Sequence, residues 1–67
     1  MLTSKQMLLT LGISRMRLYQ LRVGYTQQRP SGPYHIPPIL IEGEDWMYDR
    51  SRVVYTEEAL RKLRDRR

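Results

Sequence analysis

The sequence predicts a small α+β domain made of two short N-terminal helices, a β-hairpin and a C-terminal helix. Apolar residues recur at helical spacing within residues 3–23 and 56–66, and a helix-capping residue precedes each run. Between these segments, residues 39–55 contain aromatic and β-branched runs on both sides of a polar tip, as the strands of a hairpin do. The 67 residues of the chain suffice for one domain with a small core.

The first helix is predicted over residues 4–11. Thr3 is a suitable N-cap, and Gln6 follows it at the spacing of a capping box. Gly12 comes directly after the apolar stripe, where glycine commonly ends a helix in a left-handed conformation. A short turn is therefore expected here, with Ile13 filling the angle between this helix and the next.

The second helix is predicted over residues 15–23, with Ser14 as its N-cap and Gly24 at its end. Leu18 and Leu21 project on one side, which we expect to face the core. The opposite face and its flanks comprise Met16, Tyr19 and Gln20 with Arg15 and Arg17. Two helices joined by a glycine-containing turn are the arrangement that places a recognition helix in the DNA major groove. The alternative is an amphipathic surface helix without a ligand.

Residues 24–38 are predicted to be a loop, because four prolines and two glycines leave no room for a regular element. Arg29, Tyr34 and His35 are candidates to reach phosphates from this loop. The alternative is a plain connector whose tyrosines cover the core. His35 is the single histidine of the chain, and we assign it no catalytic or metal-binding role. A short strand is predicted over residues 39–41.

The hairpin is predicted to turn through residues 49–52, whose polar character marks the tip. Pairing across this turn puts Tyr48 opposite Val53 and Trp46 opposite Tyr55. We expect this face to cover the core, with Met47 and Val54 on the other face.

The C-terminal helix is predicted over residues 56–66, with Thr56 as its N-cap and Tyr55 packing on Leu60 as a hydrophobic staple. Its core-facing residues are expected to be Ala59, Leu60 and Leu63. Two favourable i,i+4 pairs are expected on its surface, Glu57 with Arg61 and Glu58 with Lys62.

The charge of the chain is unevenly distributed. Residues 1–41 contain five basic and no acidic residues, whereas residues 42–67 contain seven of each, so the net charge of +5 belongs to the first part. This asymmetry indicates a polyanionic partner. The chain has no cysteine, which excludes disulfides and thiolate metal sites, and no apolar run long enough to cross a membrane. We therefore expect a cytoplasmic protein without a membrane partner.

Residues 2–7 (Leu-Thr-Ser-Lys-Gln-Met), residues 11–19 (Leu-Gly-Ile-Ser-Arg-Met-Arg-Leu-Tyr) and residues 54–63 (Val-Tyr-Thr-Glu-Glu-Ala-Leu-Arg-Lys-Leu) carry a resemblance to a known class. The chain resembles the winged helix-turn-helix DNA-binding domains of the MerR and phage-excisionase types. It departs from them in two places: the connection 24–38 is longer than usual, and the tip of the wing, residues 39–55, lacks a Gly-Gly turn.

This resemblance implies a small bacterial or phage-encoded protein that binds double-stranded DNA, as a transcription regulator or a recombination directionality factor of a mobile element. The second helix would enter the major groove, and the wing tip would reach flanking backbone or the minor groove. The DNA-binding candidates are Ser14, Arg15, Met16, Arg17, Tyr19, Gln20, Arg22, Arg50 and Arg52, with Lys5 and Arg29 as further candidates. A homodimer, a cooperative oligomer on DNA and a recombinase or other protein partner remain open.

The alternative function is a protein-interaction or DNA-packaging adaptor module that docks a larger partner through the loop or the hairpin. An RNA-binding adaptor is a weaker third hypothesis. The acidic residues Glu42, Glu44, Asp45 and Asp49 have no histidine or cysteine companions, so the sequence does not predict an enzyme, a cofactor or a metal site. If the chain binds DNA, then Glu42, Glu44 and Asp45 must point away from the duplex.

Overall fold

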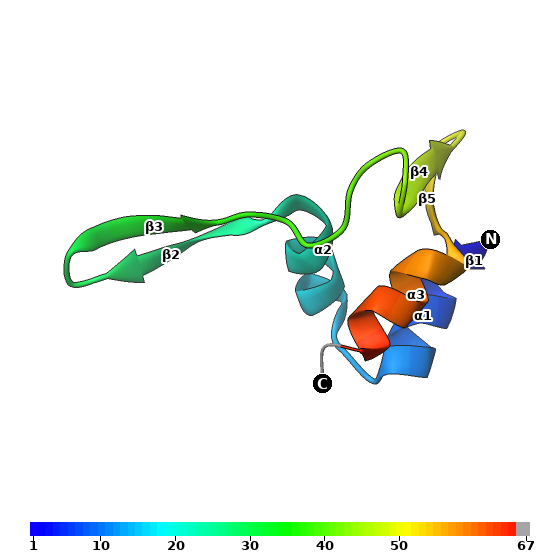
Figure 1. Cartoon of the computed structure of the whole chain (residues 1–67), viewed down its shortest axis with the longest axis horizontal. Helices are drawn as coiled ribbons and strands as arrows, with labels where there is room; N and C mark the ends of the chain where they lie inside the picture. Colours follow the sequence, from blue (N-terminus) through cyan, green and yellow to red (C-terminus); the bar gives the residue numbers. More distant parts are fainter. Residues whose placement is uncertain (66–67) are drawn as a thin grey trace.

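The structure is a computed structural model that describes residues 1–65. Its elements are β1 (Leu2–Thr3), α1 (Ser4–Leu11), α2 (Arg15–Val23), β2 (Tyr25–Arg29), β3 (Gly32–Ile36), β4 (Trp46–Asp49), β5 (Arg52–Tyr55) and α3 (Glu57–Arg64). The α+β class and the predicted order of two helices, a hairpin and a third helix are confirmed (Figure 1).

The predicted caps of the first two helices are confirmed. The Gln6 amide donates to Thr3 Oγ1 at 3.2 Å, and the Thr3 amide donates to Gln6 Oε1 at 2.8 Å, which completes the capping box. Gly12 ends α1 in the left-handed region with φ 67°. Ser14 Oγ accepts from the Arg17 amide at 3.1 Å and caps α2. Residues local to each helix end therefore determine where α1 and α2 stop and start.

The prediction for residues 24–38 is wrong, because they contain an antiparallel hairpin instead of an irregular loop. β2 and β3 pair over five residues each, around a two-residue turn at Pro30. In a hairpin with a two-residue turn, the residue pair next to the turn is hydrogen-bonded and the following pair is not. Pro33 lies in that following pair, so the hairpin loses no backbone hydrogen bond to its missing amide proton. The prolines thus occupy positions that need no amide donor. We call β2 and β3 with their turn the arm.

The second hairpin has the predicted register, with Trp46 opposite Tyr55 and Tyr48 opposite Val53. The N-terminal β1 adds a third strand to it, in the order β1-β5-β4. The predicted strand over residues 39–41 is absent, so this hairpin spans β4 and β5 and not the predicted residues 39–55. The amides of residues 39 and 40 instead bond to the Leu21 carbonyl in the last turn of α2, and Leu40 is buried in the core.

The core lies between the three helices and the β4–β5 hairpin. It consists of Met7, Leu11, Leu18, Leu21, Leu40, Trp46, Tyr55, Ala59, Leu60 and Leu63. Trp46 and Tyr55 cover it as predicted, but Tyr48 on the same face is 60% exposed. The reason is that the tip of the β4–β5 hairpin extends beyond the helices, so none of the described elements covers the face near the turn (Figure 1).

The C-terminal helix begins as predicted, with Thr56 Oγ1 accepting from the Ala59 amide at 3.1 Å. The buried Tyr55 and Leu60 lie in the same core cluster, as the predicted staple requires. The predicted end of this helix at residue 66 lies outside the described residues. No helix within residues 1–65 is both long enough and apolar enough to cross a membrane.

The surface pairs of α3 differ from those predicted. Lys62 Nζ bonds to Asp45 Oδ2 at 2.6 Å, and Arg61 lies 3.7 Å from Glu58, one turn away. Lys62 therefore pairs with the segment that precedes β4 instead of with Glu58, and Arg61 pairs with Glu58 instead of with Glu57. The stronger partner for Lys62 is a carboxylate that is itself buried.

Candidate nucleic-acid interface

The outward face of α2 is the one that the helical projection predicts. Leu18 and Leu21 are buried, whereas Met16 is 66% and Tyr19 is 51% exposed. Arg15, Met16 and Tyr19 together border a shallow apolar patch on this face. Gln20 is half-buried beside it. A methionine and a tyrosine that remain exposed on one helix face give α2 an amphipathic surface suited to a ligand with both polar and apolar edges.

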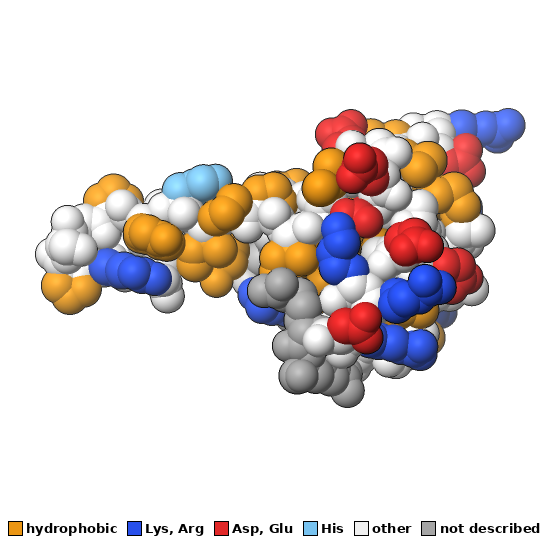
Figure 2. Space-filling model, viewed as in Figure 1, with side chains coloured by type: hydrophobic (Ala, Val, Ile, Leu, Met, Phe, Trp, Pro, Cys, Tyr) orange, Lys and Arg blue, Asp and Glu red, His pale blue; other side chains and the backbone are white. Residues whose placement is uncertain are grey.

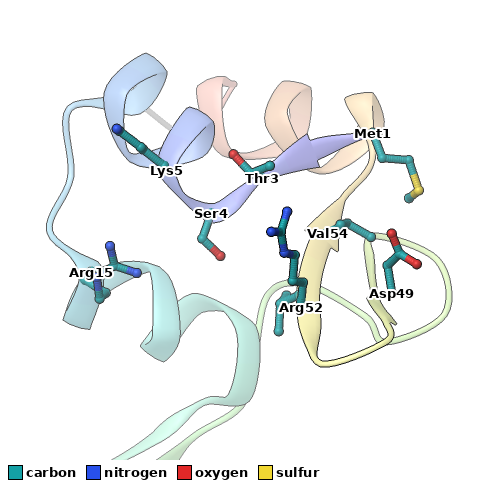
Figure 3. Close-up of a pocket in the computed structure, with 9 residues that line it drawn as sticks. Met1, Thr3, Ser4, Lys5, Arg15, Asp49, Arg52 and Val54 are labelled. Carbon is teal, nitrogen blue, oxygen red and sulfur yellow. The ribbon is translucent and has the colours of Figure 1, made fainter.

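A groove lies between the N-terminal ends of α1 and α2 and the β4–β5 hairpin (Figure 3). Its volume is about 680 Å³. It brings together Lys5 of α1, Arg15 of α2 and Arg52 of β5, which are far apart in the sequence. Asp49 also lines it. Three cations and one carboxylate leave the groove with a net charge of +2 (3 − 1) from these side chains.

The cations are spread along the rim of the groove. Arg52 extends from the hairpin toward Ser4, Arg15 lies across the groove on α2, and Lys5 points away from Arg52 on the far rim (Figure 3). The Asp49 carboxylate lies on the other side of β5 (Figure 3). Because the cations do not converge on one point, a small anion would contact only one of them. An extended polyanion lying along the rim would contact several.

Arg22 lies apart from this groove and contacts two aromatic rings. Its guanidinium carbon is 4.8 Å from the Trp46 ring centroid and 5.3 Å from that of Tyr19. Arg22 Nε and Trp46 Nε1 are buried and have no hydrogen-bond partner among the described residues. Arg22 therefore connects α2 to β4 by cation–π stacking, and only part of its guanidinium is available to a ligand.

The wing tip carries two exposed arginines, as predicted. Arg50 has φ 62°, the left-handed conformation that glycine adopts without strain. Arginine thus occupies the position that a glycine takes in the more usual turn, at a cost in conformational energy of about 1 kcal/mol. Arg52 lies opposite Asp49 in the register of the β4–β5 hairpin.

The remaining candidates are not brought to the groove. The Ser14 hydroxyl serves as the cap of α2, and Arg17 is exposed on this helix but does not line the groove. Arg29 lies on the arm. Sequence reasoning missed the partners of Arg29, which are Gln27 and Tyr34. The signal for them was the Pro-Ser-Gly turn at residues 30–32, which makes residues 27 and 34 opposite neighbours.

One acidic residue of the segment before β4 is removed from the surface. Asp45 is buried, and its Oδ2 accepts from Lys62 Nζ at 2.6 Å and from the Ile41 amide at 2.8 Å. Burial raises the pKa of this carboxyl, but the hydrogen bonds from Lys62 and Ile41 and the charge of Lys62 outweigh it, so that the pKa of Asp45 lies below its ordinary value of 3.8. Asp45 is thus withdrawn from the surface, whereas Glu42 and Glu44 are exposed, and that all three point away from a bound duplex stays a prediction.

Within residues 1–65, no group of three or more His, Cys, Asp or Glu side chains is arranged to hold a metal ion. Figure 2 shows the side of the molecule that carries α3, where acidic and basic side chains are intermixed. No family model, curated protein or solved structure matches the chain. A functional assignment therefore depends on the geometry of the groove and of α2.

Proposed function

We propose that this protein binds double-stranded DNA, with α2 in the major groove and the β4–β5 hairpin as a wing. The observation that carries the proposal is the groove in which Lys5, Arg15 and Arg52 line the rim beside the exposed face of α2. DNA is an extended polyanion whose groove floor presents polar and apolar base edges. The cationic rim is complementary to the phosphates, and the exposed face of α2 is complementary to the base edges.

The second helix has dimensions that suit this role. Its nine residues extend over about 14 Å, and the major groove, about 12 Å wide, admits an α-helix. Arg15 and Arg17 would contact phosphates or guanine edges from the two flanks of the helix. Met16 and Tyr19 would contact base edges or sugars between them, with Gln20 beside them.

The β4–β5 hairpin would contact backbone next to the major groove. The backbone strain at Arg50 supports this contact. A glycine at φ 62° would make the turn more stable, so stability does not explain the arginine, whereas a contact with DNA would. Arg52 extends into the groove toward Ser4 at the start of α1 (Figure 3). A polyanion that lies along this groove would therefore meet Arg52 of the hairpin and Arg15 of α2, which both line it.

In biological terms, we propose a cytoplasmic transcription regulator or a recombination directionality factor of the excisionase type, encoded by a bacterium, phage or mobile element. This rests on the resemblance to MerR-like and excisionase-like domains together with the geometry above. A single module of this size gains affinity from a second half-site, so a homodimer or a cooperative oligomer on DNA is part of the proposal, with a recombinase as a further partner.

A second candidate function is a protein-interaction or DNA-packaging adaptor. It is favoured by an apolar hollow of about 470 Å³ between the end of α2 and β4. Its apolar lining includes Val23, Leu40, Ile41, Trp46 and Tyr48. A partner that inserts an apolar side chain here would not need the cations of the groove, and this difference separates the two functions.

The test combines a selection of bound duplexes from a random pool with a salt titration of the selected duplex. We expect an enriched sequence and a log–log salt slope of roughly −4 to −5, from about four to six phosphate contacts. Reversing the charge of Arg15 and Arg17 to Glu should abolish binding, whereas Arg61→Glu on α3 should change it little. No enrichment together with a slope near zero would leave the adaptor function as the better explanation.

The wing is tested by replacing Arg50 and Arg52 together with alanine. Both side chains are exposed, and alanine retains the strain at residue 50, so the melting temperature should stay nearly unchanged. The affinity for cognate and scrambled duplexes should fall alike, and the salt slope should become shallower by up to about two units. Unchanged affinity on both duplexes would remove the wing from the interface.

A further inference from the structure

The arm is the most exposed element of the described chain. It projects away from the helices and gives the molecule its longest dimension of 40 Å (Figure 1). Among residues 1–65, β2 and β3 pair only with each other, and every arm residue from 26 to 35 is exposed except Gly32, which is half-buried. A two-stranded hairpin is marginally stable by itself. An arm of this kind is therefore suited to a surface that it meets on binding.

Backbone hydrogen bonds join both ends of the arm to the last turn of α2. The Gly24 amide donates to the Gln20 carbonyl at 2.8 Å, where the chain enters β2. After β3, the amides of residues 39 and 40 both donate to the Leu21 carbonyl, at 3.0 and 3.1 Å. A side chain at Gly24 would lie 2.7 Å from the Ile36 carbonyl oxygen, so the two strands pass each other closely there. The direction of the arm is thus set by α2.

The arm carries one cation, and neighbouring side chains hold it in place. Arg29 Nε and Nη2 both donate to Gln27 Oε1, at 3.0 and 2.9 Å. The guanidinium carbon lies 4.1 Å from the Tyr34 ring centroid. These bonds use the Nε–Nη2 edge, so the Nη1 end of the guanidinium remains available as a donor. An arginine ordered before binding loses less side-chain entropy when it meets its ligand.

The charge of the arm favours DNA as its binding partner. Residues 24–41 contain Arg29 and no acidic residue, so nothing in this segment offsets the guanidinium. The side chains around it are amides, hydroxyls and rings, which suit groove edges and sugars. The length also fits. Five residues per strand extend about 17 Å, which is about half of the helical repeat of roughly 34 Å and equals the spacing between neighbouring major and minor grooves.

We propose that the arm is a second DNA-binding element, which places Arg29 in the minor groove next to the major groove occupied by α2. This inference rests on the proposed function. Arg29 would donate to the base acceptors that A·T pairs expose in the minor groove, where the narrow groove of A·T tracts also has enhanced negative potential. Gln27 acts as a positioning residue for Arg29. The protein thereby selects A·T pairs on one flank of its site.

The test uses duplexes of about 30 base pairs, or three helical turns, with the selected core between A·T flanks. Replacing adenine by diaminopurine in one flank adds an amino group to the minor groove and leaves the major groove unchanged. We expect the wild-type protein to lose about tenfold in affinity when the arm-side flank is changed, and to be insensitive to the other flank.

Three variants identify the side chains. Arg29→Ala should bind both duplexes alike, about tenfold more weakly than the wild type binds the A·T duplex. Gln27→Ala keeps the charge, so it should keep the salt slope but lose much of the discrimination between flanks. Arg61→Ala on α3 is the matched control and should behave as wild type. Thermal melts verify that each variant is folded.

Two results would overturn the arm proposal while leaving the proposed function intact. One is wild-type affinity for Arg29→Ala in a series in which Arg15→Ala weakens binding. The other is an equal loss for Arg29→Ala on both duplexes with no effect of diaminopurine, which would make Arg29 a phosphate contact. A change in the self-association of free Arg29→Ala, with its DNA affinity retained, would assign the arm to a protein contact and also overturn it. If Arg15→Ala binds as wild type too, the proposed function itself fails.

Discussion

Replacing Asp45 by asparagine tests the buried contact that joins the segment before β4 to α3. A single oxygen, Asp45 Oδ2, accepts from Lys62 Nζ at 2.6 Å and from the Ile41 amide at 2.8 Å. Asparagine can keep an acceptor oxygen at this place, so the substitution removes the charge and little else. Hydrogen bonds to charged groups contribute about 1.5 to 3 kcal/mol, compared with about 0.5 to 1.5 kcal/mol for neutral ones.

The expected loss follows from these two bonds. The Lys62 side chain is 38% exposed, so solvent screening reduces its share. We expect Asp45→Asn to lower the free energy of unfolding by about 1 to 2 kcal/mol, which shifts the melting temperature of a domain of this size by about 5 to 15 °C. Asp45→Ala should cost about 1 kcal/mol more, because it leaves the Ile41 amide without an acceptor.

The pH dependence gives an independent measure. Because the pKa of Asp45 is lower in the folded state than its ordinary value of 3.8, its charge stabilises the fold above that value. This stabilisation is lost as the pH falls through the lower folded-state pKa. The difference in melting temperature between wild type and Asp45→Asn should therefore be full at neutral pH and shrink as the pH falls below 3.8.

The measurement is a series of thermal melts followed by circular dichroism at several pH values. Glu58→Gln is the matched control, since its pair with Arg61 is 3.7 Å long and both side chains are more than two-thirds exposed. We expect this control to change stability by less than about 0.5 kcal/mol. A wild-type melting temperature for Asp45→Asn at neutral pH, or a difference that does not change on acidification, would refute the reasoning.

Three further predictions concern the backbone and the interface. Gly24→Ala should lower the free energy of unfolding by about 2 kcal/mol or more, and Gly43→Ala by only about 1 kcal/mol, as measured by urea denaturation. Both glycines have a positive φ, but only a side chain at residue 24 would meet a carbonyl oxygen, at 2.7 Å. Arg50→Gly should raise the stability by about 1 kcal/mol and weaken DNA binding, and an unchanged melting temperature would show that φ 62° carries no strain. Arg15→Ala should cost about 1 to 3 kcal/mol of specific binding and Arg61→Ala much less; the reverse order in a binding titration would identify α3 as the recognition helix.

The sequence by itself determined the local features of this protein. The capping residues Thr3, Ser14 and Thr56 act on amides three residues away, so the helix boundaries could be predicted from neighbours in the chain. The register of β4 and β5 followed from a short turn and the two-residue period of strands. The outward face of α2 followed from the helical period.

The tertiary structure decided which distant residues meet. Lys62 pairs with Asp45, 17 positions earlier, and not with Glu58, because a buried carboxylate with few other partners binds a cation more strongly than an exposed one does. The arm was not predicted, because prolines normally interrupt strands. Only the register of β2 and β3 shows that these prolines occupy positions that make no backbone hydrogen bond within the hairpin. The groove with Arg15 and Arg52 likewise exists only in the folded chain, where α1, α2 and β5 lie around it. Periodicity records the neighbours of a residue along one element, whereas contacts between elements depend on how those elements pack.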